Sequence, residues 1–269
     1  MAFLAMAVAA AFSGVALFCR NGREQGALVS FALALGYAAG HFLIAGVVTL
    51  PPVDTTNWLP YFALAAAIAA VGGEVFPQAW ARLLLFGAVS IIAVRLLLAP
   101  TFRNTWSTGE GWLWVIAFAI TIVLVAVSLD AIKRSVSLPV ELPLCLLIVC
   151  AGTAGALSLS GSLLLGQFAA VLAGSVLGGS VATVRGVVAP DGFIAVSSLL
   201  LGALILSGYF FAELPAVSAA LLALGPALAI IPGGMTHPYK RIIFRGALAS
   251  GPVFAALVVA FRSSPSLDY

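Results

Sequence analysis

The residues of this sequence that could do chemistry are few, and the first is a histidine inside a long apolar run. The stretch GYAAGHFLIAG places His41 within residues 26–50, which hold no acidic or basic side chain besides it. Tyr37 lies four residues earlier, so the two side chains share one face of a helix. Polar groups in hydrocarbon must face other helices or a cavity, because leaving them unsatisfied costs several kcal/mol. We therefore expect either a ligand-binding or proton-handling pair, or a hydrogen-bonded packing contact.

Two further polar side chains interrupt the apolar runs. Gln167 follows the serine-rich stretch LSLSGS at 157–162, and it is a candidate ligand-binding residue, with an interhelical hydrogen bond as the alternative. Arg95 lies close to the end of its helix, where a long basic side chain can reach the interface. We expect Arg95 either to anchor that helix or to attract an anionic ligand.

A basic cluster follows the last glycine-rich loop. The stretch GGMTHPYKRIIFR, 233–245, contains Lys240, Arg241 and Arg245, and these are candidates for contact with anionic lipid headgroups or an acidic partner. The preference of basic residues for the inner side of a membrane explains the same cluster without any binding role.

Small residues at helical spacing predict close helix contacts. Gly36 and Gly40 form one GxxxG pair beside His41, which favours the packing interpretation of that histidine, and Gly174 and Gly178 form another. Such faces suit a neighbouring helix of the same chain, other membrane subunits or a second copy of the chain.

Several kinds of chemistry have no motif here. The sequence has no Walker A loop, no His-Glu-x-x-His and no Cys-x-x-Cys, and it assigns no catalytic residue, metal ligand or cofactor. The acidic residues all map to helix ends or loops, which argues against a conventional proton- or sodium-driven carrier. We expect ordinary helix-end roles for them. They include Glu74, Glu110, Asp130, Glu141, Asp191 and Glu213.

Composition decides the class of protein. Hydrophobic residues make up 63% and charged residues 8% of the 269 residues, whereas soluble proteins carry about a quarter charged residues. Runs of 18 or more apolar residues predict membrane-spanning helices. The scattered basic residues form no stripe for nucleic acid. The sequence therefore predicts an all-α polytopic membrane protein whose main partner is the lipid bilayer.

We expect about ten transmembrane helices with very short loops, in a single domain over 1–269 with possible halves 1–134 and 139–262. With both termini on the outer side, nine Lys and Arg residues fall at inner ends and three at outer ends, as the positive-inside rule requires. The weakest boundary separates the sixth and seventh helices. The expected location is the inner membrane of a bacterium. The predicted helices are 2–19, 26–50, 58–76, 79–99, 112–132, 140–160, 162–184, 190–212, 214–232 and 242–261.

Two functions remain open from the sequence. A small transporter or permease for a neutral or lipophilic molecule is favoured by the compact helices and by proline-broken stretches such as 224–234. It predicts a polar-lined cavity that reaches His41 or Gln167. A non-catalytic subunit or scaffold of a larger membrane complex is the alternative, and it predicts no continuous cavity. A membrane-embedded enzyme ranks third, because no nucleophile and base are paired.

Overall fold

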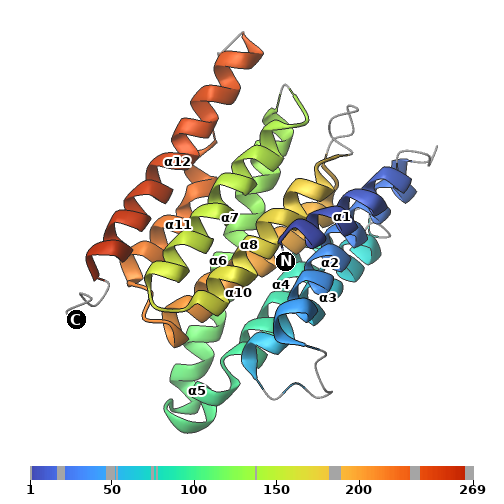
Figure 1. Cartoon of the computed structure of the whole chain (residues 1–269). Helices are drawn as coiled ribbons and strands as arrows, with labels where there is room; N and C mark the ends of the chain where they lie inside the picture. Colours follow the sequence, from blue (N-terminus) through green and yellow to red (C-terminus); the bar gives the residue numbers. More distant parts are fainter. Residues whose placement is uncertain are drawn as a thin grey trace.

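The chain folds into a bundle of helices that lie side by side (Figure 1). The computed structural model describes residues 2–16, 22–46, 52, 54–73, 76, 78–136, 138–181, 189–230 and 237–263, and among these residues no strand is present. The helices are α1 (Ala2–Ala16), α2 (Gly22–Ala45), η1 (Thr55–Trp58), α3 (Leu59–Gly73), α4 (Ala79–Leu97), α5 (Ala99–Asn104), α6 (Thr108–Ser135), α7 (Glu141–Leu159), α8 (Leu163–Gly179), α10 (Asp191–Phe211), α11 (Ala216–Leu228) and α12 (Pro238–Ser263).

Each of the ten segments predicted from the apolar runs overlaps one of these helices. Six helices are long and apolar enough to cross a membrane, namely α2, α4, α6, α7, α10 and α12, and shorter apolar helices include α8 and α11. The protein is therefore helical and suited to a membrane, as predicted. That all ten helices cross it, with both termini outside, stays a prediction.

A tight turn separates α7 from α8, at the boundary that the sequence marked least clearly. Gly161 has a φ of +91°, a left-handed conformation that glycine adopts without steric cost. Ser162 then accepts a hydrogen bond from the backbone N–H of Leu165 at 3.3 Å and caps α8. Residues 160–162 thus connect two helices of a hairpin, and the stretch LSLSGS is not part of one bent helix.

Ion pairs bring five helix termini to one end of the bundle. Asp191 at the start of α10 pairs with Arg82 near the start of α4 and with Lys133 near the end of α6. Glu141 at the start of α7 pairs with Arg245 in the second turn of α12. We call this the charged end; α5 lies at the opposite end, at the bottom of Figure 1. Successive helices from α6 to α8 therefore alternate in direction.

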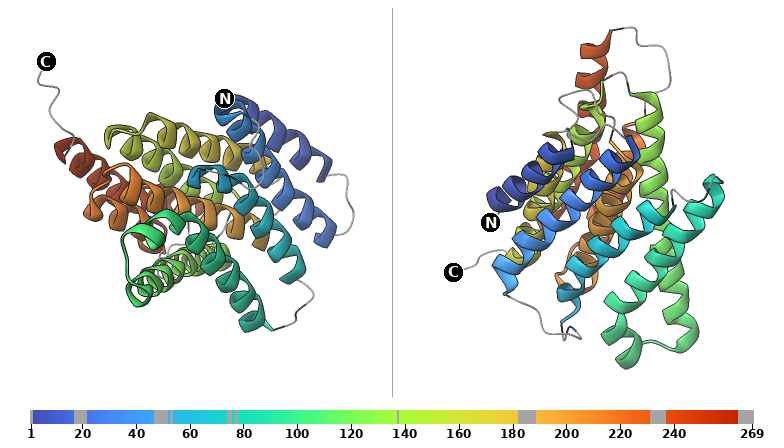
Figure 2. Two further views of the ribbon diagram at one scale, coloured as in Figure 1. Left: turned by 90° about the horizontal axis from the view of Figure 1, so that it is seen from below. Right: turned by 90° about the vertical axis from the view of Figure 1, so that its right-hand side faces the viewer.

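Helix α10 lies at the centre of the bundle. Sixteen of its residues are buried, from Gly192 to Gly208, and its neighbours include α2, α3, α6 and α8. The two further views show the helices packed side by side (Figure 2). A helix this apolar on all sides is typical of the core of a membrane bundle. A single domain over 1–269 stays a prediction.

Glycines set the closest helix contacts. A Cβ atom at Gly178 would stand 2.9 Å from the Cβ of Ala9 and nearer still to the carbonyl oxygen of Met6, so α8 packs directly against the backbone of α1. Gly174 meets the backbone of Ala2 in the same way. The predicted close packing at this GxxxG pair is confirmed, and its neighbour is a helix of the same chain.

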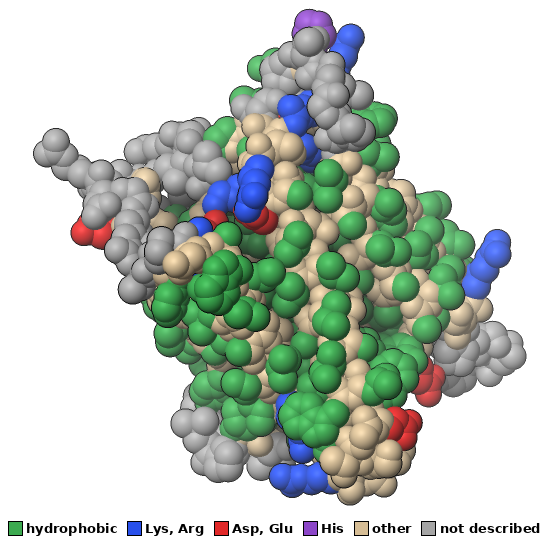
Figure 3. Space-filling model, turned by 180° about the vertical axis from the view of Figure 1, so that it is seen from behind, with side chains coloured by type: hydrophobic (Ala, Val, Ile, Leu, Met, Phe, Trp, Pro, Cys, Tyr) green, Lys and Arg blue, Asp and Glu red, His purple; other side chains and the backbone are tan. Residues whose placement is uncertain are grey.

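The outer surface of the bundle is apolar over most of its length. Large hydrophobic side chains are widely exposed, among them Ile243 at 73%, Leu113 at 65% and Phe254 at 69%. Figure 3 shows hydrophobic side chains over the middle of one face, with charged side chains toward its ends. A surface of this kind is stable against hydrocarbon and not against water.

We expect Gly178→Ala to lower stability by about 1–3 kcal/mol, because the new methyl group meets backbone that cannot turn aside. Gly87→Ala on α4 is the matched control, since nothing lies within 4 Å of the place that a Cβ would take there, and it should be neutral or stabilising by up to about 1 kcal/mol. Thermal unfolding of the purified proteins in detergent measures both. Equal melting temperatures for the two variants would contradict the α1–α8 contact.

Candidate functional site

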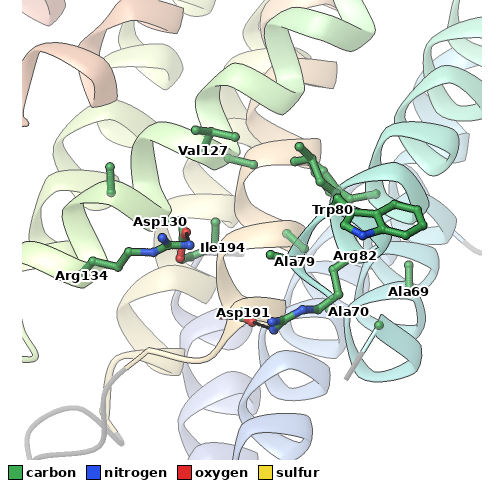
Figure 4. Close-up of a pocket in the computed structure, with 16 residues that line it drawn as sticks. Ala69, Ala70, Ala79, Trp80, Arg82, Val127, Asp130, Arg134, Asp191 and Ile194 are labelled. Carbon is green, nitrogen blue, oxygen red and sulfur yellow. Dashed lines mark hydrogen bonds and ion pairs between the residues drawn. The ribbon is translucent and has the colours of Figure 1, made fainter. Parts of the chain in front are cut away.

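A cavity of about 560 Å³ lies between α3, α4, α6 and α10 at the charged end (Figure 4). Most of its wall is apolar, and four charged side chains lie on it. Its volume is in the range of small-molecule sites, about 300–1,000 Å³. The wall consists of Ala69, Ala70, Gly73, Ala79, Trp80, Arg82, Leu83, Phe86, Ala126, Val127, Asp130, Ala131, Arg134, Asp191, Ile194 and Ala195.

The charged side chains of the cavity are paired with one another. Asp191 accepts a hydrogen bond from Arg82 Nη1 at 3.0 Å and one from Lys133 Nζ at 2.6 Å, although Lys133 lies outside the wall itself. On α6, Arg134 Nη2 lies 2.5 Å from Asp130 Oδ2. The four charges on the wall sum to zero, and Lys133 adds one positive charge beside them.

Local structure places Asp191 where these pairs can form. Pro190 precedes the helix, and Asp191 occupies its first turn, where a carboxylate is stabilised by the positive end of the helix dipole. Gly192 follows, and a Cβ there would meet the side chain of Ser30 on α2. The start of α10 can therefore lie deep among its neighbours while its carboxylate turns toward α4 and α6.

The open side of the cavity lies on the apolar surface of the bundle. Three of its lining residues are also exposed there: Trp80 at 64%, Leu83 at 45% and Val127 at 45%. In Figure 4, Trp80 lies on the opposite side of the cavity from Asp130 and Arg134, and Arg82 reaches toward Asp191 between them. The charged lining side chains are exposed as well, Arg134 at 75% and Asp191 at 43%, so the opening extends from the apolar surface to the charged end.

The predicted pair of His41 and Tyr37 lies in the core, away from the cavity. Both side chains are fully buried, and the His41 ring stacks on Phe168 with 4.1 Å between ring centroids. Within the described residues, neither ring nitrogen nor the Tyr37 hydroxyl has a hydrogen-bond partner; Asn57 approaches His41 without reaching hydrogen-bond geometry. Neither residue lines the cavity. A ligand at His41 stays a prediction.

Gln167 and Arg95 are also outside the cavity. Gln167 is exposed on α8, one residue before the buried Phe168. The Arg95 guanidinium lies 3.8 Å from the ring centroid of Phe102 on α5, a cation–π contact that ties α4 to α5. The structure thus does not bring His41, Gln167 and Arg95 together. Ligand binding by each of them stays a prediction.

The predicted basic cluster divides into an exposed and a buried part. Lys240 is exposed, Arg241 is half-buried, and Arg245 is fully buried. Arg245 Nη1 lies 2.5 Å from Glu141 Oε2, and its Nη2 donates to Ser135 Oγ at 2.9 Å. Glu141 is itself fully buried, so it is more than an ordinary helix-end charge. Lipid or partner contact by these basic residues stays a prediction, and the guanidinium of Arg245 faces inward.

Sequence reasoning missed the residues that form the cavity. Arg82, Lys133 and Asp191 come from three helices, and Arg82 and Asp191 are 109 residues apart. The only sequence signal was the position of each charge at the end of an apolar run. Among the described residues, no three His, Cys, Asp or Glu side chains are grouped so that they could hold a metal ion.

Comparison with known proteins found no relative: no protein-family model matches the chain, and neither a curated protein nor a solved structure matches it.

We expect Glu141→Gln to destabilise the protein by about 3–5 kcal/mol, because it leaves the buried Arg245 without its anionic partner. Combining it with Arg245→Gln should cost much less than the sum of the two single variants. The exposed pair supplies the control, since Asp130→Asn should cost about 0–1 kcal/mol. Thermal unfolding of the four variants measures the coupling. Additive single effects would contradict a direct buried pair.

Proposed function

We propose that this protein is a small multipass membrane transporter for a lipophilic small molecule, and that the cavity at the charged end is its binding chamber. The observation that carries the proposal is the cavity itself: a hollow with apolar walls and paired charges that opens on the apolar surface of the bundle. A scaffold subunit needs no such chamber. His41, Tyr37, Gln167 and Arg95 are outside the chamber and carry no part of this proposal.

The proposed topology has ten crossings, both termini outside and the charged end facing the cytoplasm of a bacterium. Its support is the distribution of basic residues. Six described basic side chains belong to the charged end: Arg82, Lys133, Arg134, Lys240, Arg241 and Arg245; three belong to the opposite helix ends: Arg95, Arg103 and Arg262. Basic residues are retained on the cytoplasmic side of bacterial membranes.

The chemistry of the wall supports a lipophilic substrate. Twelve of the sixteen lining residues are apolar or glycine, and the four charges on the wall cancel. A highly charged solute would have to displace existing ion pairs to enter, whereas an apolar molecule contacts alanine, leucine and aromatic side chains directly. The opening toward hydrocarbon also favours a molecule that partitions into the bilayer.

The topology can be tested by cysteine labelling in intact cells, on a background in which Cys19 is replaced by Ser. An impermeant maleimide should label Thr105→Cys from outside, because Thr105 follows α5 at the end opposite to the charged end. Val140→Cys and Lys240→Cys should be labelled only after the cells are opened. Both residues are exposed at the charged end. Labelling of Thr105→Cys and Lys240→Cys from the same side would contradict the proposal.

Transport can be tested with the purified protein in liposomes, using a panel of radiolabelled lipophilic and amphipathic compounds. We expect uptake of at least one compound, and Ala131→Trp should reduce it by at least about tenfold because the ring fills the chamber from α6. Ala117→Trp is the matched control: Ala117 is exposed on the same helix, about 21 Å from Ala131. Uptake that both variants leave unchanged would contradict the role of the cavity.

A further inference from the structure

Among the described residues, the basic side chains around the cavity outnumber the acidic ones by one. Arg82, Lys133 and Arg134 face two carboxylates in this part of the chain, Asp130 and Asp191. Asp191 therefore pairs with two cations, Arg82 and Lys133, and it keeps one partner when the other moves away. Because Lys133 contacts the other carboxylate oxygen at 2.6 Å, Asp191 remains paired when Arg82 turns away.

Arg82 also holds a hydrogen-bond donor that the protein does not use. Its Nη1 donates to Asp191, while its Nε is buried and has no acceptor among the described residues. Buried donors are satisfied in most proteins, so an unused one calls for an acceptor. In a guanidinium, Nε–H and one Nη–H point the same way and match the two oxygens of a carboxylate. Arg82 can therefore bind an anion through its Nε–H and the neighbouring Nη–H.

The apolar wall, the opening and the volume of the cavity indicate the apolar part of the ligand. The apolar wall and the opening beside Trp80, Leu83 and Val127 suit a hydrocarbon chain that enters from the bilayer. The charged residues are at the ends of their helices, where a headgroup would lie at the membrane interface. A volume of about 560 Å³ suits a molecule with one chain.

We propose that the cavity binds a long-chain fatty-acid carboxylate, with its chain between α4 and α6 and its carboxylate on Arg82. This inference rests on the proposed function and names the class of its substrate. Because the Nε edge of Arg82 is buried, Arg82 turns that edge toward the ligand and gives up its contact with Asp191, and Lys133 keeps Asp191 neutralised. The single surplus positive charge is then matched by the single negative charge of the ligand.

The test is photolabelling of the full chain in phosphatidylcholine nanodiscs at pH 8, with a palmitate analogue that carries a diazirine in its chain. At this pH a carboxylate is ionised. We expect saturable labelling that maps to α4 and α6 near Trp80 and Ala131. Oleate should displace the probe at a concentration at least about tenfold below that of oleyl alcohol, which has the same chain without the charge. Oleylamine should not displace it.

Variants separate the headgroup contact from general effects on the fold. Arg82→Gln should weaken saturable labelling by at least about tenfold. Lys133→Gln should also weaken it, because Asp191 then retains Arg82. Arg103→Gln removes an exposed arginine at the opposite end and should leave labelling unchanged. The competitor series on the unaltered protein gives an answer even if a variant fails to fold.

Three results would overturn the inference. The first is labelling that does not saturate and spreads over the exposed helix faces. The second is equal competition by oleate and oleyl alcohol, and the third is displacement by lysophosphatidylglycerol but not by oleate. The last would assign the site to a phospholipid headgroup. Saturable labelling without any liposome transport rejects the transporter and leaves the fatty-acid site standing. If Ala131→Trp blocks transport but the probe shows no saturable labelling, the fatty-acid site is rejected and the transporter is not.

Discussion

The pairing of charges at one end of the bundle is the interaction on which the arrangement of the helices depends. A carboxylate or guanidinium in a low-dielectric surrounding must find a partner, since leaving it unpaired costs several kcal/mol. Glu141 and Arg245 meet this requirement, since both side chains are fully buried and they are 104 residues apart. The half-exposed Asp191 draws Arg82 and Lys133 from two further helices. Contacts between apolar helices in a bilayer have little directionality of their own. The ion pairs therefore decide which helix ends lie together.

Small residues and ion pairs have complementary roles in this bundle. Gly174 and Gly178 let α1 and α8 approach until backbone meets backbone, and Gly152 receives Val253 from α12. Such contacts fix the distance between helices but tolerate sliding along the axis. The hydrogen bonds that join Arg245 to Glu141 and Ser135 are short and directional, so they fix the position of α12 along the axes of α6 and α7.

The helices could be predicted from the sequence because their signal is local. Each of the ten predicted segments overlaps a helix of the structure, and the turn at Gly161 was marked by its serines, whereas η1 and α5 were not predicted. The site was not predictable in the same way. Arg82 and Asp191 each look like an ordinary end-of-helix charge, and only the packing of α4 against α10 turns them into a pair. His41 stood out because it is isolated in an apolar run, yet the same isolation placed it in the core.

The position of a residue around its helix explains why neighbouring polar residues that looked alike in the sequence differ in burial. Arg241 and Arg245 are four residues apart on one face of α12, and that face meets α7, so both approach Glu141 while Lys240 remains outside. Gln167 precedes Phe168 by one residue, about 100° around the helix, so the burial of Phe168 turns Gln167 outward. Knowing which face of a helix meets which neighbour requires the fold.

The ion pairs also explain why the cavity lies where it does. Its wall contains six alanines, Ala69, Ala70, Ala79, Ala126, Ala131 and Ala195, which elsewhere in the bundle would let helices come into close contact. At the charged end, the long side chains of Arg82 on α4 and Lys133 on α6 reach Asp191 at the start of α10. Small side chains then line a space that they cannot fill. The contacts that hold the helix ends together therefore lie beside this space, and their charges are the ones that a ligand headgroup would meet.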